Sequence, residues 1–351
     1  MKVGFNYPVP WNVYGIYLGS GNPPGTSPGM DVWPQNLRTN LSVLKRELGI
    51  EVVRMFLLGN AANYGTVSGR TTILPARLDP RVTEQLGEMF QAFADARMLV
   101  IPSLIDFKAF GQRQLLKAGP PPCTNGCTDR QAIVNDAATR RGFFDQVLKP
   151  FLAISRPFRD VVYAWEVQNE PIWNVTEVRL TSLVTGYQRG VAGGTTVSKP
   201  AMRAFLQEAI DIIEGFDVAP RFHATVGHRF RQDLERFPTG TLRQFHYYPL
   251  NVLGLTLVDR TLPSADTTRA FLGEVAAGAH GHPWPELNGA DTAGPRTRVL
   301  ERLELAQAKG YPLTLLWPDD DGGATFPGPD PLKLSVGAQA GVKDFHRRAR
   351  G

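Results

Sequence analysis

Cysteine is nearly absent from this chain, with Cys123 and Cys127 the two examples among 351 residues. Both lie in the turn-rich stretch Pro-Pro-Cys-Thr-Asn-Gly-Cys, where their spacing allows either a short-loop disulfide or two free thiols. A zinc site would need further ligands, and none lies nearby in the sequence. We therefore expect no metal here and favour a disulfide within the loop.

Long apolar runs and phosphate-binding motifs are also missing. No stretch of eighteen or more apolar residues occurs, so we expect no membrane span. The start Met-Lys-Val-Gly-Phe-Asn-Tyr-Pro is too short for the apolar region of a signal peptide, which predicts a cytoplasmic protein as written, or a secreted one if a leader was removed. The absence of Gly-x-Gly-x-x-Gly after the first strand and of a Gly-Lys-Ser/Thr loop argues against nucleotide-binding folds.

Charge of one sign is not concentrated in the chain. The formal net charge is +5, with dispersed Lys and Arg and a single basic cluster at 345–350. Such a terminal cluster is typical of a solvated tail, so we expect no nucleic-acid partner. The sequence does not set the oligomeric state, and a monomer is the default expectation.

Short apolar runs alternate with helical stretches along the chain. Strands are predicted at 2–7, 51–58, 98–105, 161–168, 221–226, 242–247, 269–274 and 312–317, and helices at 36–48, 80–96, 130–154, 199–215, 294–309 and 335–348. Eight such units favour a single-domain (β/α)₈ barrel over 1–351, with an extended loop at 8–34. Gly49, Gly215 and Gly310 are predicted to be left-handed residues just past helices.

Polar side chains stand where the predicted strands end, which is where barrel enzymes build their sites. The most informative stretch is Ala164-Trp165-Glu166-Val167-Gln168-Asn169-Glu170-Pro171. Strand pairing stops at Pro171, which leaves Glu170 at the carboxyl end of the strand. A carboxyl group beside the Asn169 amide suits proton transfer to a ligand, although a lone Asn-Glu-Pro fits a capped strand end equally well.

Other predicted strands carry polar or aromatic residues in equivalent places. Arg54 interrupts an apolar strand, and burying its guanidinium requires an anionic partner. Glu274 ends the seventh strand. His246, Tyr248 and Trp317 stand at the ends of the sixth and eighth strands. Each alone is most often core, but two glutamates at strands four and seven together with these residues are hard to explain as core.

In this order, the motifs resemble glycoside hydrolase clan A, the retaining (β/α)₈ glycosidases with catalytic glutamates on strands four and seven. The closest pattern is family 5, particularly its endo-β-mannanase-like branch, and the resemblance spans nearly the whole chain. The matching pieces are Arg54-Met55-Phe56, the stretch 164–171, Phe245-His246-Tyr247-Tyr248-Pro249 and Leu272-Gly273-Glu274.

The resemblance implies a role for each matching residue. Glu170 would be the general acid/base and Glu274 the nucleophile, held ionised by Arg54. Asn169 would bond the sugar 2-hydroxyl. His246 and Tyr248 would border the site, with Tyr248 or Tyr247 near the nucleophile, and Trp317 would be the platform under the sugar ring. No cofactor is implied.

The chemistry of glycoside cleavage supports these roles independently. Retaining cleavage needs one protonated and one ionised carboxyl about 5 Å apart. Arg54 should lower the pKa of Glu274, whereas burial and that negative charge should raise the pKa of Glu170. Glu166 is expected to be a buried, paired carboxylate that shares a strand face with Glu170 but lies deeper.

The end of strand three departs from the family pattern, as does Pro318 after Trp317. Many family 5 members carry His at the end of strand three, where this chain has Ser103-Leu104-Ile105-Asp106. Asp106 could bond a substrate hydroxyl or merely start a loop. The expected function is double-displacement cleavage of β-linked poly- or oligosaccharides, mannanase- or glucanase-like. A family 39-like β-glycosidase, a transglycosylase and a catalytically silent carbohydrate-binding barrel remain alternatives.

Overall fold

The computed structural model describes residues 1–7, 33–58, 66–67, 70–71, 80–107, 127–175, 197–217, 221–248, 250–252, 255–258, 262–277, 294–318 and 334–351. The side chains of Cys123 and Cys127 and most of the loop expected at 8–34 lie outside the described residues. The disulfide and the assignment of the whole chain to one domain therefore stay predictions.

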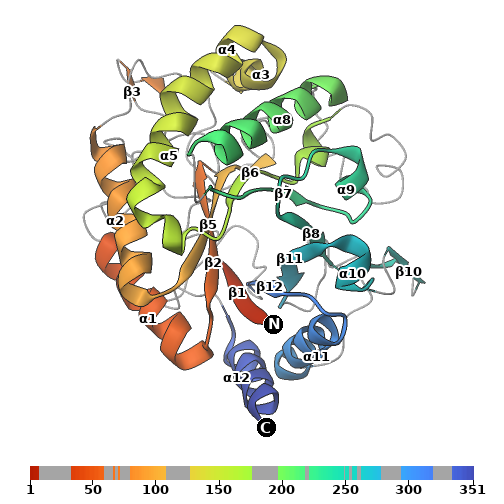
Figure 1. Cartoon of the computed structure of the whole chain (residues 1–351). Coiled ribbons are helices and arrows are strands. Elements are labelled where there is room, and N and C mark those ends of the chain that lie inside the picture. Colours follow the sequence, from red (N-terminus) through yellow and green to blue (C-terminus); the bar gives the residue numbers. More distant parts are fainter. Residues whose placement is uncertain are drawn as a thin grey trace.

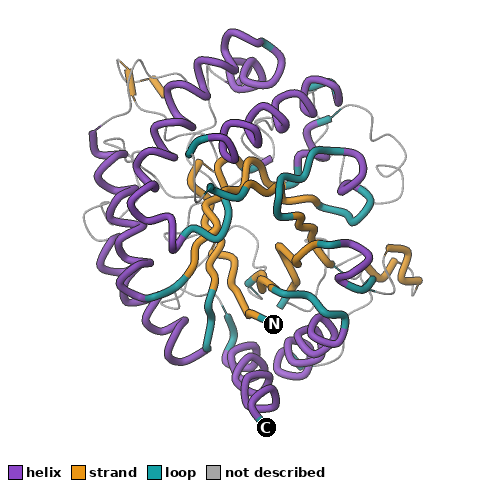
Figure 2. The backbone as a smooth tube through the Cα atoms, in the orientation of Figure 1, coloured by secondary structure: helices purple, strands orange, loops and turns teal. Residues whose placement is uncertain are grey.

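Eight parallel strands close into a barrel at the centre of the molecule (Figures 1 and 2). Strands that follow one another along the chain are neighbours, and the last pairs with the first. The barrel strands are β1 (Lys2–Tyr7), β2 (Val52–Leu58), β5 (Leu99–Ile105), β6 (Trp165–Asn169), β7 (Ala224–His228), β8 (Arg243–Tyr247), β11 (Ala270–Ala276) and β12 (Leu313–Trp317). The predicted (β/α)₈ barrel is confirmed.

Helices surround the barrel, as Figure 1 shows. The longer ones are α1 (Trp33–Leu48), α2 (Pro80–Ala96), α3 (Cys127–Asn135), α4 (Ala137–Phe143), α5 (Lys149–Ser155), α8 (Lys199–Gly215), α11 (Pro295–Ala308) and α12 (Val336–Arg350). Shorter elements are the one-turn helices α9 (Asp233–Arg236) and α10 (Ala265–Thr268), the π-helix η3 (Phe144–Leu148), the 3₁₀ helices η4 (Arg156–Val161) and η5 (Pro171–Asn174), and the two-stranded sheets of β3 (Thr66–Val67) with β4 (Arg70–Thr71) and β9 (Leu250–Val252) with β10 (Leu255–Val258). None of the described helices is long and apolar enough to cross a membrane.

The main core lies between the outer face of the barrel and the helices. In α1, Leu37, Leu41, Leu44 and Leu48 are each at most 2% exposed, which confirms the predicted apolar face. They belong to one cluster with strand residues such as Phe5. The apolar face of the helix therefore packs on the apolar outer face of the barrel strands.

Two local predictions are wrong. The helix expected at 130–154 is broken, because Asp136 leaves the helical conformation (φ −112°) and accepts a hydrogen bond from the Thr139 backbone N–H at 2.7 Å as the N-cap of α4. Gly49 and Gly310 have the expected left-handed φ of +65° and +81°. Gly215 instead remains the last helical residue of α8.

The barrel interior changes from apolar to polar along its axis. The layer nearest the amino ends of the strands is a cluster of five apolar side chains: Val52, Ile101, Phe271, Leu313 and Leu315. Two residues further along β2 lies Arg54, fully buried. Because parallel strands point the same way round the barrel, the polar ends of β6, β8, β11 and β12 gather above this layer.

Register shifts aim the residues at two strand ends. Between β11 and β8, Leu272 pairs with Phe245 but Glu274 pairs with His246, so Gly273 is an extra residue. Simple alternation would place Glu274 on the face of Leu272, outside the barrel; the shift turns it inward. A second shift, between Glu166 and Asn169 on β6, puts these two on one face.

Candidate active site

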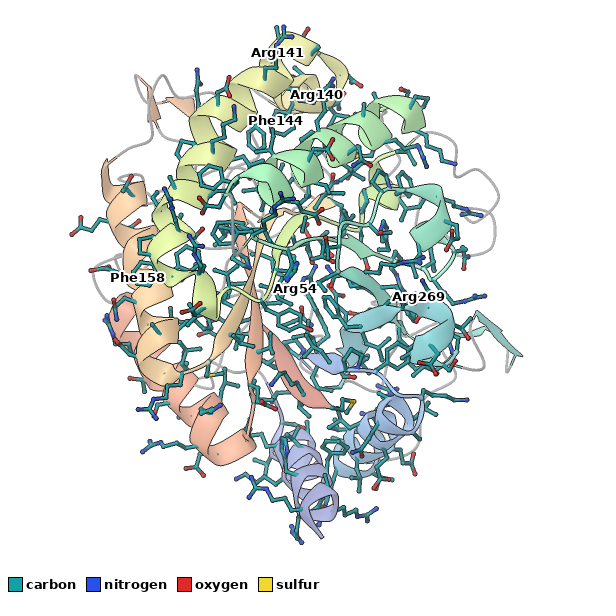
Figure 3. All side chains as sticks on the ribbon, in the orientation of Figure 1. Arg54, Arg140, Arg141, Phe144, Phe158 and Arg269 are labelled. Carbon is teal, nitrogen blue, oxygen red and sulfur yellow. The ribbon has the colours of Figure 1, made fainter. Side chains whose placement is uncertain are left out.

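Arg54 lies at the centre of the barrel (Figure 3) and uses all five of its N–H donors. Nε and Nη2 donate to the two oxygens of Glu166 at 2.7 and 2.6 Å, and Nη1 donates to Glu274 Oε1 at 2.7 Å. The remaining donors reach the side-chain oxygens of Asn6 at 2.9 Å and Asn169 at 2.7 Å. The anionic partner predicted for Arg54 is therefore present twice.

Glu166 is held from several sides beneath the site. Besides the guanidinium, it accepts hydrogen bonds from Ser103 Oγ at 2.5 Å and from the side-chain amide of Gln244. Burial acts to raise the pKa of Glu166, but the charge and hydrogen bonds of Arg54 outweigh it and lower that pKa. The predicted buried, paired carboxylate is confirmed. The register shift on β6 also brings Asn169 onto the face of Glu166.

Glu170 and Glu274 face each other across the mouth of the barrel. One oxygen of each carboxylate and one ring nitrogen of His246 all lie within 4.8 Å of one another. His246 Nδ1 is 2.7 Å from Glu170 Oε1 and 3.3 Å from Glu274 Oε2. Two segments that are about a hundred residues apart in sequence thus meet at one place, as the motifs predicted.

The backbone at Glu170 adopts a left-handed conformation, with φ 47° and ψ 54°. A residue other than glycine rarely takes this backbone conformation, because it costs free energy and persists only where the surroundings impose it. Here the Glu170 N–H still donates to the Gly227 carbonyl at 2.6 Å, while Pro171 begins η5. The turn directs the carboxyl toward His246 instead of continuing the strand.

Glu274 receives a second short hydrogen bond, from Tyr248 Oη at 2.6 Å. Burial raises the pKa of Glu274 above its ordinary value, and Arg54 and Tyr248 reduce this rise without reversing it. The predicted low pKa of Glu274 is therefore wrong in its net direction, because the guanidinium is shared with Glu166 and the Glu274 carboxyl is buried. Burial also raises the pKa of Tyr248 well above 10, so its hydroxyl stays a donor.

His246 is fully enclosed, and burial lowers its pKa to about 3. The imidazole is therefore neutral at ordinary pH, and each ring nitrogen is either a donor or an acceptor. A neutral imidazole can hydrogen-bond to a neighbouring carboxyl group without adding a positive charge to the site. Among the described residues, these three also form the one group with metal-ligand geometry. The expectation that no metal is needed stays a prediction.

The remaining predicted site residues occupy different depths. Asn169 donates through Nδ2 to Asp106 Oδ2 at 2.8 Å and is 2% exposed. Asp106 is fully buried and accepts this bond, so it positions Asn169, and its contact with a substrate hydroxyl stays a prediction. Trp317 is half-buried at the end of β12, with its ring edge-on to Phe56 at 6.2 Å between centroids.

Several residues of the site were not predicted from sequence. Asn6 accepts a hydrogen bond from Arg54, and its own side-chain amide donates to the backbone carbonyls of Gly273 and Leu316 at 3.0 and 3.3 Å, so it helps to fix the position of the guanidinium. Gly227 leaves room for that guanidinium, since a Cβ there would lie 3.0 Å from Arg54 Nη2. Arg229, just past β7, places Nε 3.6 Å from Glu170 Oε1. A polar or charged residue at a strand end was the available signal for Asn6 and Arg229.

Comparison with known structures shows the same fold in several solved proteins. The chain is similar to the β-mannanase from the blue mussel Mytilus edulis (TM-score 0.66, 16% identity, 97% of this chain and 90% of that chain). It is also similar to the β-1,4-D-mannanase from Cryptopygus antarcticus (0.67, 14%, 97% and 88%). A third is a GH5_18 protein from Streptomyces cattleya in complex with Manβ1-4GlcNAc (0.65, 16%, 99% and 81%). Neither protein-family models nor curated protein sequences give a match.

Proposed function

We propose that this protein is a retaining β-glycosidase, with Glu170 as general acid/base and Glu274 as nucleophile. The observation that carries the proposal is that one oxygen of each carboxylate lies within 4.8 Å of an oxygen of the other. Retaining glycosidases hold their two carboxyl groups about 5–5.5 Å apart, whereas inverting ones leave about 6.5–9.5 Å for a water molecule. The spacing here suits direct attack by a carboxylate on the sugar.

Glu170 and Glu274 can carry out both displacement steps of the reaction. An oxygen of Glu274 attacks the anomeric carbon, the glycosidic C–O bond breaks, and the proton of Glu170 passes to the leaving oxygen. Glu170, now ionised, then takes a proton from water while that water oxygen attacks the same carbon and releases Glu274. The sugar keeps its β configuration because it has been inverted twice.

The surrounding residues support these steps in different ways. Arg54 and Tyr248 hold one oxygen each of Glu274, which leaves its carboxylate fixed in orientation. Asn169 retains one N–H and one lone pair beyond its bonds to Arg54 and Asp106, and these suit a sugar 2-hydroxyl. Trp317 offers an aromatic face for the C–H side of a sugar ring.

For the substrate, we propose β-linked mannose-containing poly- or oligosaccharides. The support is similarity of the fold to proteins described as β-mannanases, and to one solved with Manβ1-4GlcNAc, together with the motifs noted above. A β-1,4-glucan is the nearest competing substrate, because it differs from mannan at the 2-hydroxyl that Asn169 would contact.

The proposal is tested by measuring reducing-end release from β-mannan and β-1,4-glucan by the wild-type chain. Glu170→Gln and Glu274→Gln should each lower turnover by orders of magnitude while leaving the folded circular-dichroism spectrum unchanged. Glu208→Gln, at a side chain that is 43% exposed, is the matched control. Sugar binding by the wild-type chain without any release would instead favour a silent binding barrel, and near-normal turnover by either glutamine variant would remove the assigned roles.

A further inference from the structure

Arg229 is a buried cation that the double displacement does not use. Its side chain is 7% exposed and lies immediately after β7, between the barrel strands that carry Glu170 and His246. Its guanidinium carbon stands 4.5 Å from the ring centroid of Tyr248 and 5.1 Å from that of Phe230. Two aromatic contacts of this kind fix the plane of the guanidinium.

The N–H donors of the Arg229 guanidinium have few acceptors among the described residues. Within the described part of the chain, Arg229 makes one ion pair, Nε to Glu170 Oε1 at 3.6 Å, and no hydrogen bond. Arg54 shows the contrast, because all five of its N–H groups have acceptors at 2.6 to 2.9 Å. A charged group that is removed from water without hydrogen bonds costs free energy, so a site that keeps one has a use for its donors.

The position of Arg229 indicates which part of a substrate it would meet. A general acid must lie beside the oxygen of the leaving sugar, and Arg229 neighbours Glu170. Tyr248, on which the guanidinium stacks, holds the other carboxylate through its hydroxyl. The planar fork of an arginine matches a carboxylate through two parallel hydrogen bonds.

We propose that Arg229 binds a carboxylate carried by the leaving sugar, so that the enzyme accepts a uronic acid in its leaving-group subsite. This assignment rests on the proposed function, which places the leaving group beside Glu170. It also removes a conflict in the mechanism. When Glu170 holds the proton that catalysis needs, Arg229 loses the charged partner of the one ion pair that it makes among the described residues, and a substrate carboxylate supplies another.

The simpler alternative is that Arg229 serves as a fixed counter-ion of Glu170. In that case a neutral sugar and an acidic one would bind equally well. The two alternatives are separated by comparing two ligands of one shape, methyl β-D-glucuronide and its neutral uronamide, by isothermal titration of the full chain at pH 7. Neither ligand has to be hydrolysed for the comparison.

The wild-type chain should bind the glucuronide at least about tenfold more tightly than the uronamide, the effect of hydrogen bonds to a charged group. Arg229→Gln should remove this preference. Arg231→Gln, at the exposed neighbour two residues on, should keep it. If Arg229→Gln does not fold by circular dichroism, Arg229→Lys, which keeps the charge without the fork, should retain only part of the preference.

Equal affinity of the wild-type chain for the two ligands would overturn the proposal, as would a preference that survives in Arg229→Gln or Arg229→Lys unchanged. The titration is also independent of turnover. A glucuronide preference in a chain that hydrolyses no glycan would overturn the proposed function and leave the carboxylate site in place. Hydrolysis without that preference would remove the carboxylate site alone.

Discussion

Tyr248 Oη lies 2.6 Å from Glu274 Oε2 and donates a hydrogen bond to it. This bond links the end of β8 to the end of β11 and opposes the burial that raises the pKa of Glu274. The hydroxyl cannot become a competing anion, because burial raises its own pKa well above 10. The ionisation of the proposed nucleophile therefore depends on a neutral neighbour as well as on Arg54.

Tyr248→Phe should move the acidic limb of the pH profile of kcat/KM to higher pH. The reaction needs Glu274 ionised, so activity falls as pH drops through its raised pKa. Loss of a hydrogen bond to the charged form raises that pKa further, by about one unit. Tyr163→Phe is the control, since Tyr163 packs edge-on to Phe271 at the opposite end of the barrel. A limb that stays in place in Tyr248→Phe would contradict this.

Arg54→Met should destabilise the fold strongly, because it leaves Glu166 buried and without its cation. Removing one partner of a buried ion pair costs about 3–5 kcal/mol. The free energy of unfolding in urea measures the effect. Lys2→Met, which removes the partly exposed pair with Glu51, should change stability by at most about 1 kcal/mol. Similar losses in both variants would show that the buried network does not carry this stability.

His228→Gln should reduce the loss of stability on acidification. Burial lowers the pKa of His228 to about 3, so the folded protein binds fewer protons than the unfolded chain between about pH 6.5 and 3. Its contribution is therefore present above that range and is lost as the pH falls through it. Thermal unfolding from pH 8 to 4 should show a shallower slope for His228→Gln than for wild type. His223→Gln, at an exposed site, should keep the wild-type slope; equal slopes for both variants would refute the assignment.

Azide should distinguish the two glutamates by stereochemistry. In Glu170→Ala, azide can replace water in the second step and should yield a β-glycosyl azide. In Glu274→Ala, azide attacks in place of the missing carboxylate and should yield the α-azide. Glu166→Ala, at the fully buried carboxylate of β6 beneath the site, should give no rescue, because this carboxylate does not meet the sugar. A β-azide from Glu274→Ala would reverse the roles.

Much of the fold follows from period and chemistry in the sequence. The apolar face of α1 and the closed barrel were predicted because local periodicity and packing agree there. The motifs also brought Glu170, Glu274, Arg54 and His246 together correctly. The contact that ties Tyr248 to Glu274 could not be fixed, since either adjacent tyrosine fitted the pattern.

The errors come from features that hydrophobic periodicity does not show. The break in the helix expected at 130–154 depends on the Asp136 cap. The inward direction of Glu274 was predicted from the motifs and not from alternation, which alone would place it outside the barrel without the register shift at Gly273. The pKa of Glu274 depends on how Arg54 divides its charge between two carboxylates, which requires their positions. Arg229 could not be assigned to the site from the sequence, because its burial and its contacts depend on two aromatic rings and a carboxylate from three different segments.

The most direct test of the central claim is labelling with a 2-fluoro-β-glycoside of the preferred sugar, followed by mass spectrometry of the proteolytic peptides. The proposed mechanism predicts one glycosyl group per chain, attached to the peptide that contains Glu274 and absent from Glu274→Gln. Attachment at Glu170, or no covalent product from an enzyme that hydrolyses the matching substrate, would contradict it.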